Sequence, residues 1–237
     1  MAPVLTPADL AHYHREGYVL VRGLLPAALC ASAREAILQV CAPAVGAMWS
    51  PVTFDHENPD QQMDIHRALV DDRVLTAVEQ LLGAQAQVWY GMGAVVPGGG
   101  GRGLPWHQDN QYTHILHHAL NTFIALNEIT ADMATLWVAP RSHLSGVRPS
   151  HEHASGHREA DVAPEQALPL PTLRAGDACI FNRNTLHRSL TNTTTQQRVA
   201  YAAQYVEASG VYASTGEPIA RIAGRALQAR WAVDARR

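Results

Sequence analysis

Apolar residues recur with a helical period in the first third of the chain. We expect helices over 7–16, 27–41 and 72–82, and a strand over 18–21. Thr6 is suited to cap the first helix, Pro7 to occupy its first position and Gly17 to end it. The front of the chain is therefore predicted to be mainly helical.

The pattern changes near residue 85, where short apolar segments separated by Gly, Pro, Asn and Thr begin. We expect strands over 86–96, 105–110, 121–128, 135–139, 168–174, 178–182, 185–189 and 197–206. Many short strands with frequent turns predict a sandwich or barrel rather than a parallel sheet. The polar, histidine-rich stretch 141–164 predicts a long loop, and the residues after Gly216 predict a weak helix.

No strong linker or internal repeat divides the 237 residues, so we expect one domain. Its predicted parts are a helical front (1–84), a barrel core (85–206) and a C-terminal extension (207–237). Hydrophobic residues make up 47% and charged residues 16%, which indicates a globular protein. The net charge of −3 and the lack of any Lys/Arg-rich block argue against a nucleic-acid partner.

The cysteines and the apolar runs limit which classes of protein and which cellular locations are expected. Cys30, Cys41 and Cys179 are odd in number and form no Cys-x-x-Cys pair, which argues against a disulfide framework and a thiolate metal site. The N-terminus lacks the layout of a signal peptide, and no apolar run reaches the roughly 18 residues that a membrane span needs. We expect a cytoplasmic enzyme or binding protein with no membrane partner.

The segment Trp106-His107-Gln108-Asp109 carries the first candidate chemistry. Side chains two apart on a strand point to the same face, so His107 and Asp109 would lie side by side. An imidazole and a carboxylate placed in this way can occupy adjacent positions on one metal ion. Taken alone, the pair is more typical of a surface histidine beside a hydrated aspartate.

A second candidate ligand is His187, which follows the apolar segment 178–181 near the other end of the strand-rich region. Two histidines and one carboxylate leave three metal positions open, as in Fe(II) oxygenases. Zinc hydrolases also use three protein ligands and a water, so the ligands alone leave the metal undecided.

Arg198 lies eleven residues after His187, on the next strand-like segment. Its guanidinium can hold a carboxylate through two parallel hydrogen bonds, which lysine cannot reproduce. An arginine here suits the distal carboxylate of a dicarboxylate co-substrate that chelates iron at its other end. The alternative is that Arg198 is a surface arginine on a strand. This alternative is disfavoured because the same sequence also contains the three candidate metal ligands.

Several short motifs follow one another along the chain in a specific order and spacing. They are Tyr13-x-x-x-Gly17-Tyr18-Val19, Val21-x-Gly23-Leu24-Leu25, Leu82-Gly83, Trp106-His107-Gln108-Asp109, Leu136-Trp137-Val138-x-Pro140-x-Ser142-His143, Gly176-Asp177, and His187-x-Ser189-x-x-Asn192 followed by Arg198. Together they resemble the phytanoyl-CoA dioxygenase family of Fe(II)/2-oxoglutarate-dependent oxygenases, from about Thr6 to Tyr205.

The resemblance implies an all-β core with flanking helices, folded as a double-stranded β-helix, which is a cupin-like jelly-roll barrel. It implies iron held by His107, Asp109 and His187, with 2-oxoglutarate as co-substrate and O2 as oxidant. It also implies that Arg198 anchors 2-oxoglutarate and that Ser189 donates a hydroxyl to the same carboxylate.

Two positions depart from the family pattern, and both lie where members shape the mouth of the pocket. Val95-Val96-Pro97 stands where many members carry a lysine before the proline, and Met133-Ala134 stands where many have Asn-Gly. The substrate of the family is therefore not carried over, and nothing indicates a CoA thioester. Candidate substrate contacts are Trp89, Tyr112, His114 and Trp137.

The remaining motifs favour plainer interpretations. The other histidines of 114–118 and 151–157 are expected to be solvated loop residues, and Gly98 to Gly101 to be a flexible loop over the site, since they lack a P-loop lysine.

The predicted function is hydroxylation of an unactivated C–H bond in a small metabolite, such as one of natural-product biosynthesis, with succinate and CO2 as co-products. Desaturation, epoxidation or ring formation with the same cofactors is an alternative outcome. A cupin-like metal hydrolase or isomerase, or a non-catalytic binding barrel, is an alternative of another class. The sequence leaves the substrate and the oligomeric state undetermined.

Overall fold

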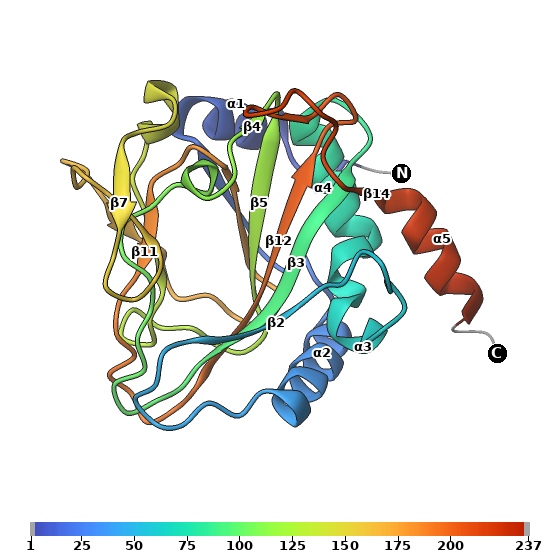
Figure 1. The fold of residues 1–237 in the computed structure, drawn as a ribbon. Helices are drawn as coiled ribbons and strands as arrows, with labels where there is room; N and C mark the ends of the chain where they lie inside the picture. Colours follow the sequence, from blue (N-terminus) through green and yellow to red (C-terminus); the bar gives the residue numbers. More distant parts are fainter. Residues whose placement is uncertain (1–2, 235–237) are drawn as a thin grey trace.

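The computed structural model describes residues 3–234, which form two facing β-sheets with helices on one side (Figure 1). The helices are α1 (Pro7–Glu16), α2 (Ala27–Val40), α3 (Met63–His66), α4 (Asp72–Leu82) and α5 (Gly224–Asp234), with 3-10 helices η1 (Arg67–Val70), η2 (Asp109–Gln111) and η3 (Ser142–Ser145). The strands are β1 (Tyr18–Val21), β2 (Ser50–Thr53), β3 (Gln87–Val96), β4 (Ile115–Leu116), β5 (Ala119–Ala125), β6 (Leu136–Val138), β7 (Ser150–Glu152), β8 (Arg158–Ala160), β9 (Leu168–Pro169), β10 (Ala178–Asn182), β11 (His187–Ser189), β12 (Arg198–Val206), β13 (Val211–Tyr212) and β14 (Ile222–Ala223).

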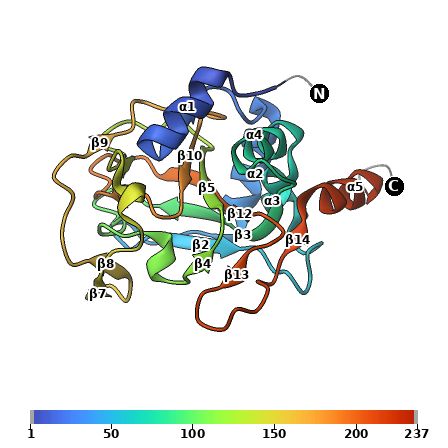
Figure 2. The same cartoon turned by 90° about the horizontal axis from the view of Figure 1, so that it is seen from above.

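The large sheet has seven antiparallel strands in the order β1-β10-β5-β12-β3-β14, with β2 also paired to β3. A smaller sheet has the order β11-β6-β9. Figures 1 and 2 show α2, α3 and α4 against one face of the large sheet, with β11 and β7 on the opposite side. The arrangement is the predicted jelly-roll core with flanking helices.

Alternation along β12 explains how one strand serves both the core and the cavity. Val199 and Tyr201 belong to the apolar cluster beneath the helices, whereas Ala200 belongs to a second cluster between the two sheets. Arg198 and Gln204 share the inner face with Ala200, because side chains two apart on a strand point the same way. The strand thus presents two polar groups to the space between the sheets.

The predicted helix boundaries in the front of the chain are confirmed. The Thr6 side chain accepts a hydrogen bond from the Asp9 backbone N–H, and Gly17 ends α1 with a φ of 85°. A left-handed φ of this kind favours glycine at a helix C-terminus. Asp71 caps α4 by accepting hydrogen bonds from the N–H groups of Arg73 and Val74.

Three sequence predictions need correction. The strand expected over 105–110 is reduced to a single bridge between His107 and His187, and a 3-10 turn begins at Asp109. The strand expected over 168–174 covers only β9. The stretch 141–164 is not one long loop, because it contains η3 and the short hairpin of β7 and β8.

The C-terminal extension contributes to the core more than its weak pattern indicates. Leu227 and Trp231 of α5 are buried in the main apolar cluster, and β14 pairs with β3 at the edge of the large sheet. That sheet therefore joins strands from all three predicted parts of the chain. Within residues 3–234, no helix is both long and apolar enough to cross a bilayer.

Candidate metal centre

His107, Asp109 and His187 converge between the two sheets, although they come from distant parts of the chain. The backbones of His107 and His187 exchange two hydrogen bonds of 3.0 Å, so their rings lie 4.1 Å apart between centroids. Asp109 Oδ1 is 3.8 Å from His107 Nε2 and 4.0 Å from His187 Nε2. One ligand atom from each residue lies within 4.8 Å of the other two, which suits a single metal ion.

Backbone carbonyls fix the tautomer of both histidines. Nδ1 of His107 lies 2.8 Å from the Pro105 oxygen, and Nδ1 of His187 lies 2.9 Å from the Thr185 oxygen. A carbonyl oxygen only accepts, so each Nδ1 carries the proton and each Nε2 keeps its lone pair. Such contacts orient metal-binding histidines. Both lone pairs are therefore free for a metal ion beside Asp109.

The electrostatics keep His107 and Asp109 in the protonation state that a metal needs. Burial, and then the neighbouring His187, lower the pKa of His107 to about 3, so the ring is neutral. Burial alone would raise the pKa of Asp109, but His187, Arg183, His107 and a hydrogen bond from Asn121 outweigh it. The net effect is a lowered pKa, and Asp109 is an anion at neutral pH.

Asp109 faces the histidines because of a tethered turn and not because of strand alternation. The buried Gln108 side chain donates to the carbonyls of Gly146 and Asn184 and accepts from the Arg148 N–H at 2.7 Å. These bonds end the extended backbone at Gln108 and start η2 at Asp109. The predicted pairing of His107 with Asp109 is thus present on a different local structure.

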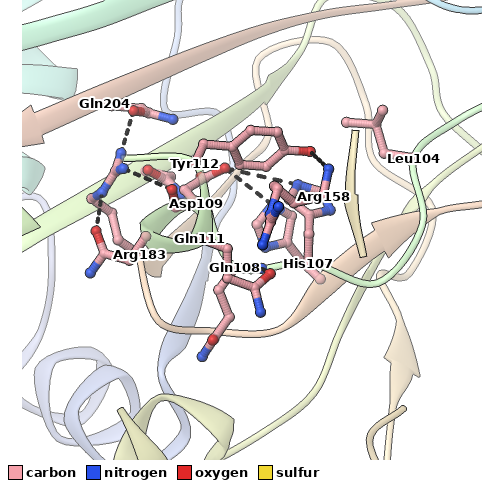
Figure 3. Close-up of polar contacts among 12 residues, drawn as sticks. Leu104, His107, Gln108, Asp109, Gln111, Tyr112, Arg158, Arg183 and Gln204 are labelled. Atoms are coloured by element: carbon pink, nitrogen blue, oxygen red, sulfur yellow. Dashed lines mark hydrogen bonds and ion pairs between the residues drawn. The ribbon is translucent and has the colours of Figure 1, made fainter. Parts of the chain in front are cut away.

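Arg183 holds the other side of this turn, and sequence reasoning missed it. Its guanidinium is 2% exposed and donates to the carbonyls of Asp109 (3.1 Å) and Thr113 (3.0 Å). It also donates to the side-chain oxygens of Asn110 (2.9 Å) and Gln204. Figure 3 shows Arg183 between Gln204 and the turn that carries Asp109. An arginine four residues before His187 carries no sequence signal for this role.

We expect Arg183→Lys to weaken Fe(II) binding by about 10-fold, the lower end of the effect of groups that orient ligands. A lysine nitrogen has three donors and cannot serve four acceptors arranged around a planar fork. Fe(II) affinity measured anaerobically by calorimetry is the readout. The affinity for 2-oxoglutarate at saturating Fe(II) should stay unchanged, and a loss of that affinity alone would contradict the positioning role. Arg73→Lys, at an exposed position of helix α4, is the matched control.

Arg198 lies in the same cavity as the three candidate ligands and is 6% exposed. Its Nη1 donates a hydrogen bond of 2.9 Å to the Ala134 carbonyl. Its guanidinium carbon lies over the Phe123 ring, 5.4 Å from the ring centroid. Its Nε has no hydrogen-bond partner, and no carboxylate of residues 3–232 pairs with it. Burial lowers its pKa to about 10, so the group remains a cation at neutral pH. An unpaired buried cation calls for an anionic ligand.

Ser189 faces the same cavity from β11, two residues beyond His187. Its hydroxyl oxygen accepts a hydrogen bond of 3.1 Å from the Leu104 N–H. The hydroxyl proton is therefore free to be donated to a ligand beside Arg198.

The space around the candidate ligands has two connected parts. The inner cavity encloses about 110 Å³ and includes Phe123, Leu136, Phe181, Ser189 and Arg198. The outer chamber is lined by Trp49, Trp89, Tyr90, Met92, Leu104, Tyr112, Thr113, His157, Arg183 and Gln204, together with His107 and Asp109. Seven residues belong to both parts: Trp49, Tyr90, Met92, Leu104, His107, Asp109 and Gln204.

The four expected substrate contacts divide evenly. Trp89 and Tyr112 line the outer chamber, whereas His114 and Trp137 line neither part. Trp137 lies between Leu136 and Val138 on β6, and alternation turns it to the far face, against Arg188. His114 is exposed. Sequence reasoning missed Trp49, Met92, His157 and Gln204.

The glycine-rich segment 98–101 does not cover the site. Gly99 and Gly100 donate to the carbonyls of Thr194 and Asn192, and Asn192 donates to Gly101. These bonds hold the segment against residues 192–194, and it lines neither part of the cavity. The expected solvent exposure holds for His151, but His157 reaches the outer chamber.

Two histidines and one carboxylate on a jelly-roll core define the class of non-haem iron oxygenases. A profile of the phytanoyl-CoA dioxygenase (PhyH) family matches residues 13–200, and the chain belongs to this family. It is a 2-oxoglutarate-dependent non-haem iron dioxygenase, whose cofactors are iron and 2-oxoglutarate.

Individual relatives agree with this assignment. The chain is 27% identical over 220 residues to ectoine dioxygenase of Streptomyces anulatus, covering 80% of this chain and 74% of that protein. Its fold is similar to EvdO2 of Micromonospora carbonacea var. aurantiaca, solved with 2-oxoglutarate (TM-score 0.74, 19% identity, 92% and 97% of the two chains). It is also similar to the carbocyclase SnoK of nogalamycin biosynthesis (TM-score 0.72, 19% identity, 90% of each chain).

Proposed function

We propose that His107, Asp109 and His187 are the iron ligands, and that Arg198 and Ser189 bind the distal carboxylate of 2-oxoglutarate. The unpaired guanidinium of Arg198, buried in the same cavity as the candidate ligands, is the observation that carries this proposal. A metal hydrolase or isomerase of the same fold has no need for such a cation.

The residues present fit both groups. The lone pairs on the two Nε2 atoms and the Asp109 carboxylate supply the ligand set that Fe(II) oxygenases use. The planar fork of Arg198 and the free proton of Ser189 supply donors for one carboxylate. When bound, iron and 2-oxoglutarate supply the oxidation of a C–H bond by O2, with succinate and CO2 as co-products.

The protein contributes orientation and exclusion of water. Asn121 and the tethered turn hold Asp109, and the two carbonyl contacts hold the histidine rings. The largely apolar walls of the cavity, including Phe123, keep bulk water from the reacting groups. We propose that the reaction is hydroxylation of a small metabolite in the cytoplasm, with desaturation, epoxidation or ring formation as alternatives separated by product mass.

The test is whether the purified protein converts 2-oxoglutarate into succinate. Even before a substrate is known, we expect slow succinate release that requires Fe(II), O2 and an added two-electron reductant such as ascorbate, which supplies the electrons that the substrate would otherwise provide. Zinc in place of iron should give no succinate. Succinate release without iron would contradict the proposed function. So would the complete absence of succinate when 2-oxoglutarate, Fe(II), O2 and the reductant are all present.

We expect oxygenated or desaturated products and no halogenated product. Asp109 already occupies the position that a halide would need, because it lies within 4.0 Å of both histidine Nε2 atoms. Reactions with chloride or bromide present, compared by product mass with halide-free reactions, provide the measurement. A halogenated product from the unaltered protein would mean that Asp109 does not bind the metal.

A further inference from the structure

We propose that the outer chamber binds an uncharged ring compound and holds one of its carbonyl or hydroxyl oxygens on the Gln204 amide. An ammonium group at that position is rejected. This inference rests on the proposed function, because it places the substrate beside the metal. It is carried by the polar groups, the aromatic walls and the charges of the chamber.

The side-chain amide of Gln204 has a defined orientation. Arg183 has only donors, so the Gln204 oxygen must face its guanidinium, and the two N–H groups must point elsewhere. Neither N–H has an acceptor among residues 3–232, and Gln204 lines both parts of the cavity. Figure 3 shows the amide nitrogen on the side away from Arg183. The chamber therefore presents a fixed pair of donors that lack a protein partner.

A β-bulge places two adjacent aromatic residues on the chamber. Gln204 pairs with Tyr90, but Tyr205 pairs with Val88, so Trp89 has no partner on β12. The extra residue turns both Trp89 and Tyr90 towards the chamber. The guanidinium of Arg183 covers the Trp89 ring at 4.6 Å. Arg183 therefore holds both the Gln204 amide and the Trp89 ring in place.

A further wall is formed by aromatic rings from three loops. Tyr112 is held by the Arg158 N–H, which donates to its hydroxyl at 3.0 Å, and Tyr112 is 45% exposed. His157 lies 6.4 Å from Tyr112 and 5.8 Å from Trp49 between ring centroids. These rings offer a surface for a flat or cyclic molecule.

The charges of the chamber favour an uncharged occupant over a cation. Among the described residues that line it, Asp109 is the one carboxylate, and it is the proposed metal ligand. Arg183 is a buried cation, and four of its five N–H donors are taken by protein oxygens. The ring of His157 has no hydrogen-bond partner in the described part of the chain, and burial lowers its pKa, so it is neutral. Beside the Gln204 amide, an ammonium group would meet N–H donors, and the carboxylate of Asp109 would already be bound to the metal.

The experiment compares two bicyclic probes of the same size, 1-tetralone and protonated 1-aminotetralin. Binding is measured by quenching of tryptophan fluorescence in protein loaded anaerobically with Fe(II) and 2-oxoglutarate. We expect 1-tetralone to bind about 10-fold more tightly, the effect of one hydrogen bond made and one unpaired charge avoided. Equal or tighter binding of the amine, or no saturable binding of either probe, would overturn the inference.

Gln204→Glu is the decisive variant, because a carboxylate keeps the contact with Arg183 but removes both N–H donors. We expect it to abolish or reverse the preference for the ketone. Gln196→Glu makes the same change on an exposed loop outside the cavity and should leave the preference intact. An unchanged preference in Gln204→Glu would overturn the role of the amide. Tyr112→Ala should weaken the binding of both probes to the same extent, by roughly 2- to 10-fold.

The failure of the two proposals can be told apart. The visible charge-transfer band of the Fe(II)–2-oxoglutarate pair is recorded in the same samples before a probe is added. If the band forms and the ketone is not preferred, the inference about the outer chamber is wrong. If the band does not form, the proposed function is wrong.

Discussion

His187→Ala is expected to abolish turnover and to weaken Fe(II) binding by more than about 100-fold, beyond the effect of losing a group that only orients a ligand. Three protein ligands leave none to spare, and an alanine methyl cannot replace the Nε2 lone pair that faces Asp109 at 4.0 Å. Bound iron after gel filtration and succinate release are the two measurements. His107→Ala and Asp109→Ala should behave in the same way.

The matched control is His114→Ala, which removes an exposed imidazole outside both parts of the cavity. It should bind iron and turn over like the wild type. Circular dichroism should show that the His187 variant keeps its fold, because the ring contributes contacts mainly with Phe181 and His107. Normal iron content and turnover in His187→Ala would remove this residue from the metal centre.

Arg198→Lys should raise the Michaelis constant for 2-oxoglutarate by roughly 10- to 150-fold, the value of a charge-assisted hydrogen bond. The substitution keeps a positive charge but loses the planar fork, and the lysine nitrogen would still be drawn to the Ala134 carbonyl. Steady-state succinate release at varied 2-oxoglutarate is the measurement. Fe(II) affinity in the absence of 2-oxoglutarate should be unchanged.

That unchanged iron affinity separates the Arg198 prediction from the His187 prediction, since loss of iron would lower turnover at every 2-oxoglutarate concentration. Arg73→Lys, on the exposed surface of α4, should leave the Michaelis constant as it is. If Arg198→Lys also left it unchanged, the carboxylate of 2-oxoglutarate would be bound elsewhere.

Features set by local physics could be predicted from the sequence. The capping of α1 by Thr6 and its end at Gly17 depend on neighbouring residues alone. Alternation along β12 likewise predicts that Arg198 shares a face with Ala200. The candidate ligands, by contrast, are identified by the spacing of their motifs and the family resemblance, because the strand expected over 105–110 is reduced to a single bridge.

The features that were missed depend on contacts between distant parts of the chain. The turn at Asp109 is held by Arg183, and the bulge at Trp89 exists only in relation to β12. Trp49 and His157 meet over the outer chamber, although one precedes β2 and the other precedes β8. No local pattern reports such pairings, and so the metal centre was easier to predict than the substrate side.

The most direct test of the central claim is an anaerobic titration of the protein with Fe(II) and 2-oxoglutarate, followed through the visible charge-transfer band of the pair. The account predicts that the band saturates at one Fe(II) and one 2-oxoglutarate per chain. It also predicts no band in His187→Ala and a band that needs much more 2-oxoglutarate in Arg198→Lys. A band of full intensity in His187→Ala, with the same stoichiometry, would contradict the account.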